Sequence, residues 1–225
     1  MYRYLFEKKD TYSLRGICML MIMIAHVCQQ NDYQFVGIGK QLMYLLEKGG
    51  FLGTSVFLLL SGYGCFFSFS KGKMSFSFIC EKLIRIVKPF LVASFFLFVI
   101  RFFILDKPGG ILDTMQQLFT LSLSYEVPLP SPNVNMWFLK IIFILYVITL
   151  SVFYIFKTPK NRILATTFVV ALLCIYLFSK GYPQFIYVLT ICFPIGLCCG
   201  MKSFGLNTRF ENNRLGISVT LFLFF

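Results

Sequence analysis

The one histidine of the chain, His26, and an arginine eleven residues before it, Arg15, have the types and spacing best suited to chemistry. A neutral imidazole can accept a proton near physiological pH, so His26 is a candidate general base. Eleven helical residues make three turns plus about 20°, so both side chains share one face, about 16 Å apart along the axis. A cation at Arg15 can then hold an anionic donor while His26 acts further along the same face.

Each of these residues also has an interpretation without catalysis. Ionisable side chains inside apolar segments are costly and usually functional, but His26 can simply hydrogen-bond a neighbouring helix. Arg15 can be an anchor whose charged end reaches lipid phosphate. Position and spacing alone leave both interpretations open for both residues.

A basic cluster formed by Lys82, Arg85 and Lys88 precedes Pro89. Lys82 and Arg85 are one helical turn apart and therefore share a face. Such a pair can bind the phosphates of a nucleotide-like donor. Contact with anionic lipid, or a purely topological role, is the alternative, and it is the one that the cluster taken alone favours.

Small and interfacial residues mark two further places. The segments 49–53 and 61–64 are rich in glycine, with Ser61, Gly62 and Tyr63 in the second. Small residues allow close helix packing in lipid, which is their most frequent use, and they also let a ligand approach the backbone. Trp137 fits an aromatic belt at the outer interface. We expect Lys140, and Arg101 near the outer end of another segment, to snorkel outward.

These residues lie in a chain whose composition requires lipid as a solvent. Of its 225 residues, 58% are hydrophobic and 13% are charged, whereas soluble domains carry about 25% charged residues. The net charge of +12 comes from basic residues between apolar runs, which indicates the positive-inside bias of cytoplasmic loops rather than nucleic-acid binding. None of the eight cysteines has zinc-type spacing with a His partner, so we interpret them as small apolar side chains and expect no metal.

The apolar runs predict an all-α, polytopic bundle of transmembrane helices. Six complete spans and the start of a seventh are expected at Leu14–Cys28, Phe51–Phe69, Ile84–Leu105, Trp137–Phe156, Ile163–Phe178, Phe185–Cys199 and from Leu215 onward. Ser13 is a candidate N-cap of the first. The seventh has about 11 residues, too few to cross the bilayer core. We therefore expect one membrane domain over residues 1–225 that is incomplete at its C-terminus.

Loop charge predicts the orientation of these spans. The links at 70–83, 157–162 and 200–214 are basic, and the links at 106–136 and 179–184 are poor in basic residues. The two sets alternate, which predicts a cytoplasmic N-terminus. The loop expected from Gln29 to Gly50 is ambiguous, because Lys40 and Lys48 are offset by two acidic residues.

Several of these features occur in one order along the chain. They are Arg15 and His26, the run Gly53–Tyr63, Lys82 and Arg85 before Pro89, and Trp137-Phe138-Leu139 followed by Tyr146. This order resembles that of the acyltransferase family 3 proteins, bacterial membrane O-acyltransferases that modify lipopolysaccharide, peptidoglycan, capsule and other glycans. The resemblance covers about Ser13 to Cys199. It implies that Arg15 and His26 are the essential pair, that Lys82 and Arg85 stand at an Arg-x-x-Arg motif, and that Ser61-Gly62-Tyr63 matches Ser-Gly-Phe.

Three positions depart from the pattern of many family members. Tyr12 stands in place of an aspartate before the arginine, and Ser55 in place of an aspartate in the second span. Ile142 and Phe143 stand in place of paired glutamates after the tryptophan. The Trp-Phe-Leu form is closer to members acting on sugars or polysaccharide intermediates. The acyltransferase class therefore stands, and the acceptor stays open.

The resemblance implies transfer of an acyl group, with acetyl as the expectation, from acetyl-coenzyme A or another acyl-coenzyme A. The acceptor is a hydroxyl of a cell-surface glycan or its lipid-linked precursor. Arg15, Lys82 and Arg85 are expected to hold the donor, with His26 as general base, in a multi-pass protein of the bacterial cytoplasmic membrane. A transporter or flippase for a glycan intermediate, and an inactive fragment, are the alternatives; the oligomeric state is left open.

Overall fold

Every regular element in the described part of the chain is an α-helix. The computed structural model describes residues 8–31, 37–71, 76–99 and 137–203. Its helices are α1 (Lys8–Asn31), α2 (Ile38–Lys71), α3 (Phe76–Val99), α5 (Trp137–Ile155), α6 (Pro159–Ser179), α7 (Gln184–Thr190) and α8 (Cys192–Ser203). The all-α prediction is thereby confirmed for these residues.

Five segments of the described chain are long and apolar enough to cross a membrane. They are Lys9–Cys28, Ile38–Phe69, Trp137–Ile155, Pro159–Ser179 and Gln184–Lys202, and they coincide with the first, second, fourth, fifth and sixth predicted spans. Helix α3 covers most of the third, but the four charged residues from Glu81 to Lys88 keep it outside this set. The end of the third predicted span and the whole seventh lie outside the described residues.

Two sequence-based expectations about helix boundaries are wrong. The segment between Gln29 and Gly50 is not one loop, because α1 continues to Asn31 and α2 begins at Ile38. Its Gln, Glu and Lys residues lower the mean hydropathy, but they are good helix formers, as are its Leu and Met residues, and no proline interrupts them. Ser13 is not an N-cap either: it lies inside α1, and its hydroxyl donates a hydrogen bond to the Lys9 carbonyl at 3.2 Å. The predicted first loop is therefore far shorter.

The sixth predicted span is broken at Ile191 into α7 and α8. Pro194 explains the break, since it has no N–H to donate to the carbonyl of Thr190, four residues earlier, and its ring crowds that carbonyl. The hydroxyl of Thr190 donates a hydrogen bond to the Ile186 carbonyl, one turn earlier, at 2.6 Å. Together the two short helices still make one apolar segment of crossing length.

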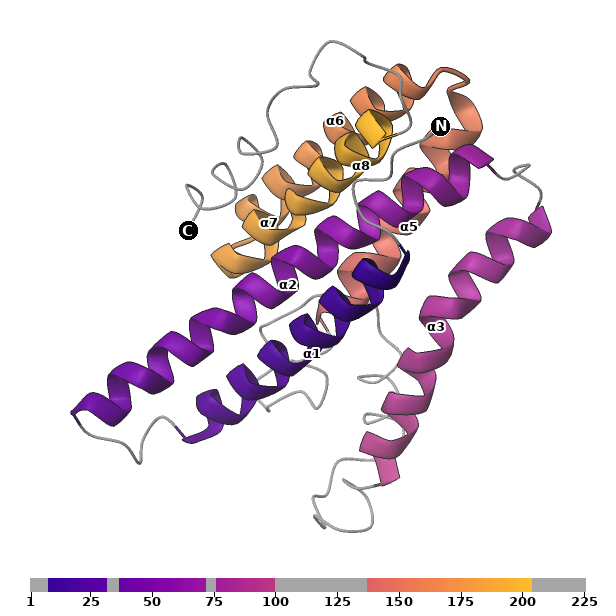
Figure 1. The fold of residues 1–225 in the computed structure, drawn as a ribbon. Coiled ribbons are helices and arrows are strands. Elements are labelled where there is room, and N and C mark those ends of the chain that lie inside the picture. The colour runs from indigo at the N-terminus through magenta and orange to yellow at the C-terminus, as the bar shows by residue number, and fades with distance from the viewer. Residues whose placement is uncertain (1–7, 32–36, 72–75, 100–136, 204–225) are drawn as a thin grey trace.

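Helix α2 is the centre of the bundle and makes its largest contacts with α1 and α8 (Figure 1). Gly50 faces Ala25 of α1, where an added Cβ would lie 2.4 Å from the Ala25 Cβ. On the α8 side, an added Cβ at Gly62 would lie 2.1 Å from the Phe193 carbonyl oxygen, and one at Gly196 would lie 2.0 Å from that of Leu59. The backbones of α2 and α8 therefore touch, as small residues permit in lipid.

Helix directions follow from which residues meet. Along α1 and α2, Ala25 meets Gly50 and Arg15 meets Gly64, so these helices are antiparallel. Aromatic rings of α2 and α5 pair in rising order along both helices: the centroids of Phe57 and Phe138 are 5.3 Å apart, and those of Phe69 and Phe153 are 5.8 Å apart. Helices α2 and α5 are therefore parallel. Helix α3 lies at the side of the bundle and runs in the direction of α1 (Figure 1). These directions agree with the alternation inferred from loop charge, while a cytoplasmic N-terminus stays a prediction.

Substituting Gly62 with valine should destabilise the fold. The new side chain would overlap the Phe193 backbone, and overpacking a well-packed contact costs about 1–3 kcal/mol or more. We expect a clearly lower thermal unfolding temperature for the detergent-purified protein. Gly16→Val is the matched control, because no heavy atom of the described chain lies within 4 Å of an added Cβ there. Equal unfolding temperatures for the two variants would contradict the close α2–α8 contact.

Candidate active site

Arg15 and His26 lie on the side of α1 that faces the protein. Between them on this side, Cys18 and Ala25 are buried and Ile22 is half-buried. Exposed apolar residues such as Met19 and Met23 border the same side, so Arg15 and His26 lie at its edge. Both candidate residues are themselves half-buried. The structure therefore gives them the shared face that their spacing predicts, with about 16 Å of helix rise between them.

The guanidinium of Arg15 points into the bundle. Its Cζ lies 5.9 Å from the centroid of the Phe57 ring, and its Nη2 lies 3.7 Å from where a Cβ of Gly64 would be. It also interacts electrostatically with the phenol of Tyr146 on α5. Its Nε is buried and has no hydrogen-bond partner within the described chain. An inward direction is typical of functional cations in membranes.

Tyr146 and Cys65 complete the surroundings of Arg15. The two side chains hydrogen-bond to each other, and Cys65 directly follows Gly64 in α2. The Tyr146 ring lies 6.2 Å from that of Phe69 and 6.3 Å from that of Phe193, measured between centroids. Sequence reasoning placed Tyr146 in a motif without giving it a role and treated Cys65 as apolar. In the sequence, Tyr146 is marked only by its place after Trp137-Phe138-Leu139 in the ordered motif. Nothing in the sequence marks Cys65 as a site residue.

His26 lies at the other end of the same face. Its neighbour Ala25 packs on Gly50, so His26 is at the level where α2 enters the bundle. The next residue of α2, Phe51, belongs to an aromatic cluster with Trp137 of α5 and Phe185 of α7. Ring centroids are 5.5 Å apart for Phe51 and Phe185, and 5.3 Å apart for Trp137 and Phe185. Trp137 thus packs inside the bundle at the end where His26 lies.

Lys140 does not snorkel outward as expected. It is 7% exposed, one turn after Trp137. Helix α5 packs against α2, α3 and α6, so Lys140 is surrounded by protein on most sides. Its place near the end of a predicted span could not reveal these neighbouring helices. Arg101, for which the same behaviour was expected, lies outside the described residues.

Ser61, Gly62 and Tyr63 are all buried in α2. Gly62 is in backbone contact with α8, and the Tyr63 ring lies 5.0 Å from that of Phe67 between centroids. These contacts are packing contacts. A substrate role for the three residues stays a prediction.

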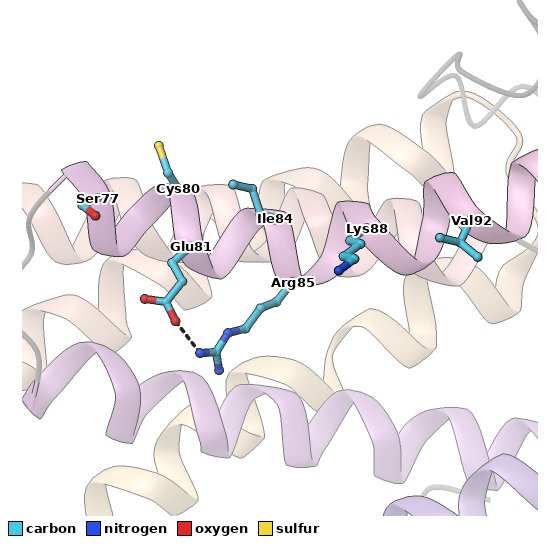
Figure 2. Close-up of a pocket in the computed structure, with 7 residues that line it drawn as sticks. All are labelled: Ser77, Cys80, Glu81, Ile84, Arg85, Lys88 and Val92. Carbon is cyan, nitrogen blue, oxygen red and sulfur yellow. Dashed lines mark hydrogen bonds and ion pairs between the residues drawn. The ribbon is translucent and has the colours of Figure 1, made fainter.

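The basic cluster lies on α3, which packs chiefly on α5. An open groove of about 760 Å³ follows this helix and is lined by Arg85, Lys88 and Glu81 among others (Figure 2). Arg85 and Glu81 form an ion pair one turn apart, drawn as the dashed line in Figure 2. Lys82 is on the same helix, but its side chain lies outside the described set. The structure therefore gives two separate basic places, one inside the bundle and one on α3.

All eight cysteines carry free thiols. Within the described residues, no group of three His, Cys, Asp or Glu side chains is arranged to hold a metal ion. The side chains of Arg15 and His26 are themselves suited to anion binding and to proton transfer.

The chain matches the acyltransferase family 3 domain over residues 13–225. It belongs to this family. The matched range includes every candidate residue, from Arg15 on α1 to Tyr146 on α5. No curated protein and no solved structure matches the chain significantly.

As a family 3 protein, this chain is a multi-pass membrane acyltransferase. Acyl transfer needs a group to take the proton from the acceptor and a site for the activated donor. In the described helices, His26 has the chemistry for the first task and Arg15 for the second. They are brought to one side of α1 by spacing, and α2 and α5 complete the surroundings of Arg15.

Proposed function

We propose that this acyltransferase moves an acetyl group from acetyl-coenzyme A to a hydroxyl of a cell-surface glycan or its lipid-linked precursor. It would do so in the bacterial cytoplasmic membrane, taking the donor from the cytoplasmic side. The observation that carries the proposal is the buried, unpartnered Nε of Arg15, on the same side of α1 as His26, in a chain of this family. A buried donor without an acceptor is costly, so a ligand that supplies an anionic oxygen there is favoured.

His26 acts as the general base in this proposal. Its imidazole accepts the proton of the acceptor hydroxyl, and the hydroxyl oxygen attacks the thioester carbonyl carbon. An ester C–O bond forms and the C–S bond breaks. The coenzyme thiolate leaves and takes up the proton from the imidazolium, so protons and electrons balance. General-base catalysis of this kind contributes about 10²–10⁴-fold.

Arg15 holds the donor at a distance from the reacting carbon. The helix rise of about 16 Å between Arg15 and His26 prevents both side chains from touching one atom. In coenzyme A, an extended pantetheine arm separates the phosphates from the thioester. Arg15 therefore suits the phosphate end and His26 the thioester end. The apolar surroundings strengthen the contact at Arg15 relative to water.

Arg85, with Lys82, provides a second place for the phosphates on α3. Arg85 is exposed and paired with Glu81, so it would exchange a carboxylate partner for a phosphate. Such an exchange at an exposed position contributes little free energy. We therefore assign the basic cluster to capture of the donor and Arg15 to its tight binding.

The acceptor side of the proposal is the end of the bundle that carries His26. The cluster of Phe51, Trp137 and Phe185 lies at this end. Sugar rings present C–H faces that stack on aromatic side chains, so a saccharide hydroxyl could be offered to His26 there. Ser61, Gly62 and Tyr63 support this arrangement from within the core through the α2–α8 contact.

The direct test uses the purified protein in lipid nanodiscs with acetyl-coenzyme A labelled in its acetyl group. We expect acetyl-coenzyme A to raise the unfolding temperature, since a ligand present at 100 times its Kd stabilises by about 2.7 kcal/mol. Separately, mass spectrometry of envelope glycans from cells with and without the gene should show an acetyl ester only with the gene. Absence of both effects would overturn the proposal. A glycan transporter has no reason to bind acetyl-coenzyme A, so the thermal shift also separates these two functions.

A further inference from the structure

Gly64 differs from the closely packed glycines of α2 and resembles Gly49, where an added Cβ would lie 3.6 Å from the end of the Met21 side chain. Added Cβ atoms at Gly50, Gly53 and Gly62 would lie 2.4, 2.9 and 2.1 Å from atoms of α1 or α8. At Gly64, the one described atom within 4 Å of an added Cβ is Arg15 Nη2, at 3.7 Å. Close packing therefore explains Gly50, Gly53 and Gly62, but it does not explain Gly64.

The missing side chain at Gly64 leaves room beside the guanidinium of Arg15. Gly64 is half-buried. Phe57, about two helical turns earlier on the same face of α2, has its ring centroid 5.9 Å from Arg15 Cζ. Tyr146 borders the same place, because it interacts with Arg15 and hydrogen-bonds to Cys65. A ligand in this room would meet the Arg15 guanidinium at Nη2, the atom that lies next to Gly64.

We infer that the room bordered by Arg15, Gly64 and Tyr146 is a subsite for a phosphate group of the acyl donor. This inference rests on the proposed function and adds two residues to it, Gly64 as the open floor and Tyr146 as the phenol that borders the subsite from α5. A guanidinium matches phosphate oxygens in geometry and charge. A glycine lets the ligand approach the helix backbone closely. Thus the subsite joins α1, α2 and α5 around one anionic group.

The depth of the subsite suits a phosphate that arrives from one membrane face. Arg15 is six residues, or about 9 Å, past the start of the apolar segment at Lys9. Gly64 is seven residues, or about 10 Å, before the end of α2 at Lys71. Helical side chains also lean toward the helix N-terminus, which brings the guanidinium of Arg15 nearer that face. A phosphate can therefore reach the subsite without crossing the hydrocarbon core.

Gly64→Leu tests the subsite, with Gly16→Leu as its matched control. Leucine at position 64 fills the room beside Arg15, so we expect the KM for acetyl-coenzyme A to rise at least about tenfold, with kcat retained at saturation. Gly16 is exposed on α1 next to Arg15, with no described heavy atom within 4 Å of an added Cβ, so its variant should keep the wild-type KM. Gly64→Ala adds one methyl group at ordinary contact distance, and we expect it to fold normally with a smaller rise in KM.

Two nanodisc compositions separate the two sources of phosphate. In neutral phosphatidylcholine and in a mixture with anionic phosphatidylglycerol, a donor subsite predicts the same rise in KM for Gly64→Leu. A rise confined to the anionic mixture would assign the subsite to lipid phosphate and overturn the donor assignment. A wild-type KM in both Gly64 variants would overturn the subsite itself. Failure of the wild-type protein to turn over acetyl-coenzyme A would instead overturn the proposed function.

Discussion

Replacing His26 with alanine should lower acetyl transfer by about 100-fold or more while the protein still folds. The expected size follows from the loss of a general base, which contributes about 10²–10⁴-fold. His26 is half-buried at the side of α1, and its buried neighbour Ala25, which packs on Gly50, is unchanged in the variant. The measurement is initial rate with labelled acetyl-coenzyme A, together with the unfolding temperature with and without this donor. We expect the donor-induced stabilisation to persist, because donor binding is assigned to Arg15.

Two further variants make this result specific to proton transfer. His26→Gln keeps a polar side chain that can hydrogen-bond but cannot act as the base, so it should be as inactive as the alanine variant. Val27→Ala changes the next residue, which is 59% exposed on the lipid side of α1, and should keep the wild-type rate. Substantial activity in the glutamine variant would show that His26 serves as a structural hydrogen-bonding residue.

The positions of the membrane helices could be predicted because one physical requirement governs them. Backbone polar groups in lipid must be satisfied within a helix, so apolar runs of sufficient length locate the spans. Helix ends in more polar surroundings do not obey this requirement. The residues from Ile38 to Gly50 are helical but carry Lys40 and Lys48, so hydropathy alone placed them in a loop.

The candidate site was predictable as far as it depends on a single helix. The spacing of Arg15 and His26 gave their common side of α1, because helical geometry is the same wherever the helix lies. It could not show whether this side faces lipid or protein. That distinction depends on α2 and α5, which bring Phe57, Gly64 and Tyr146 to Arg15.

Glycines of one helix illustrate the same limit. Gly62 and Gly64 are two residues apart and look equivalent in sequence, yet their surroundings differ. Gly62 meets the backbone of α8, whereas Gly64 meets the end of a flexible side chain from α1. Lys140 is a similar case, since its burial depends on three neighbouring helices. Properties set by contacts between helices are therefore the ones that one sequence does not reveal.

Replacing Arg15 with alanine should abolish the stabilisation by acetyl-coenzyme A and lower kcat/KM by about 10–150-fold. This range corresponds to loss of a hydrogen bond to a charged group, about 1.5–3 kcal/mol. Without donor, the variant should be about as stable as the wild type. The buried Nε has no partner to lose, so removing it relieves a desolvation cost that offsets the lost contact with Phe57. Arg15→Lys keeps the charge but not the planar guanidinium, so its kcat/KM should lie between that of the wild type and that of Arg15→Ala.

Arg162→Ala is the matched control and should show the opposite pattern. Arg162 also lies over an aromatic ring, with its Cζ 5.0 Å from the Phe153 centroid, but its Nε donates to the Phe156 carbonyl at 2.6 Å. Removing Arg162 breaks a made hydrogen bond at the link between α5 and α6, so the unfolding temperature should fall while KM for acetyl-coenzyme A stays unchanged. If instead Arg15→Ala destabilised the donor-free protein and left KM unchanged, Arg15 would be a structural cation. The paired variants thus separate an arginine that serves the fold from one that is available for a ligand.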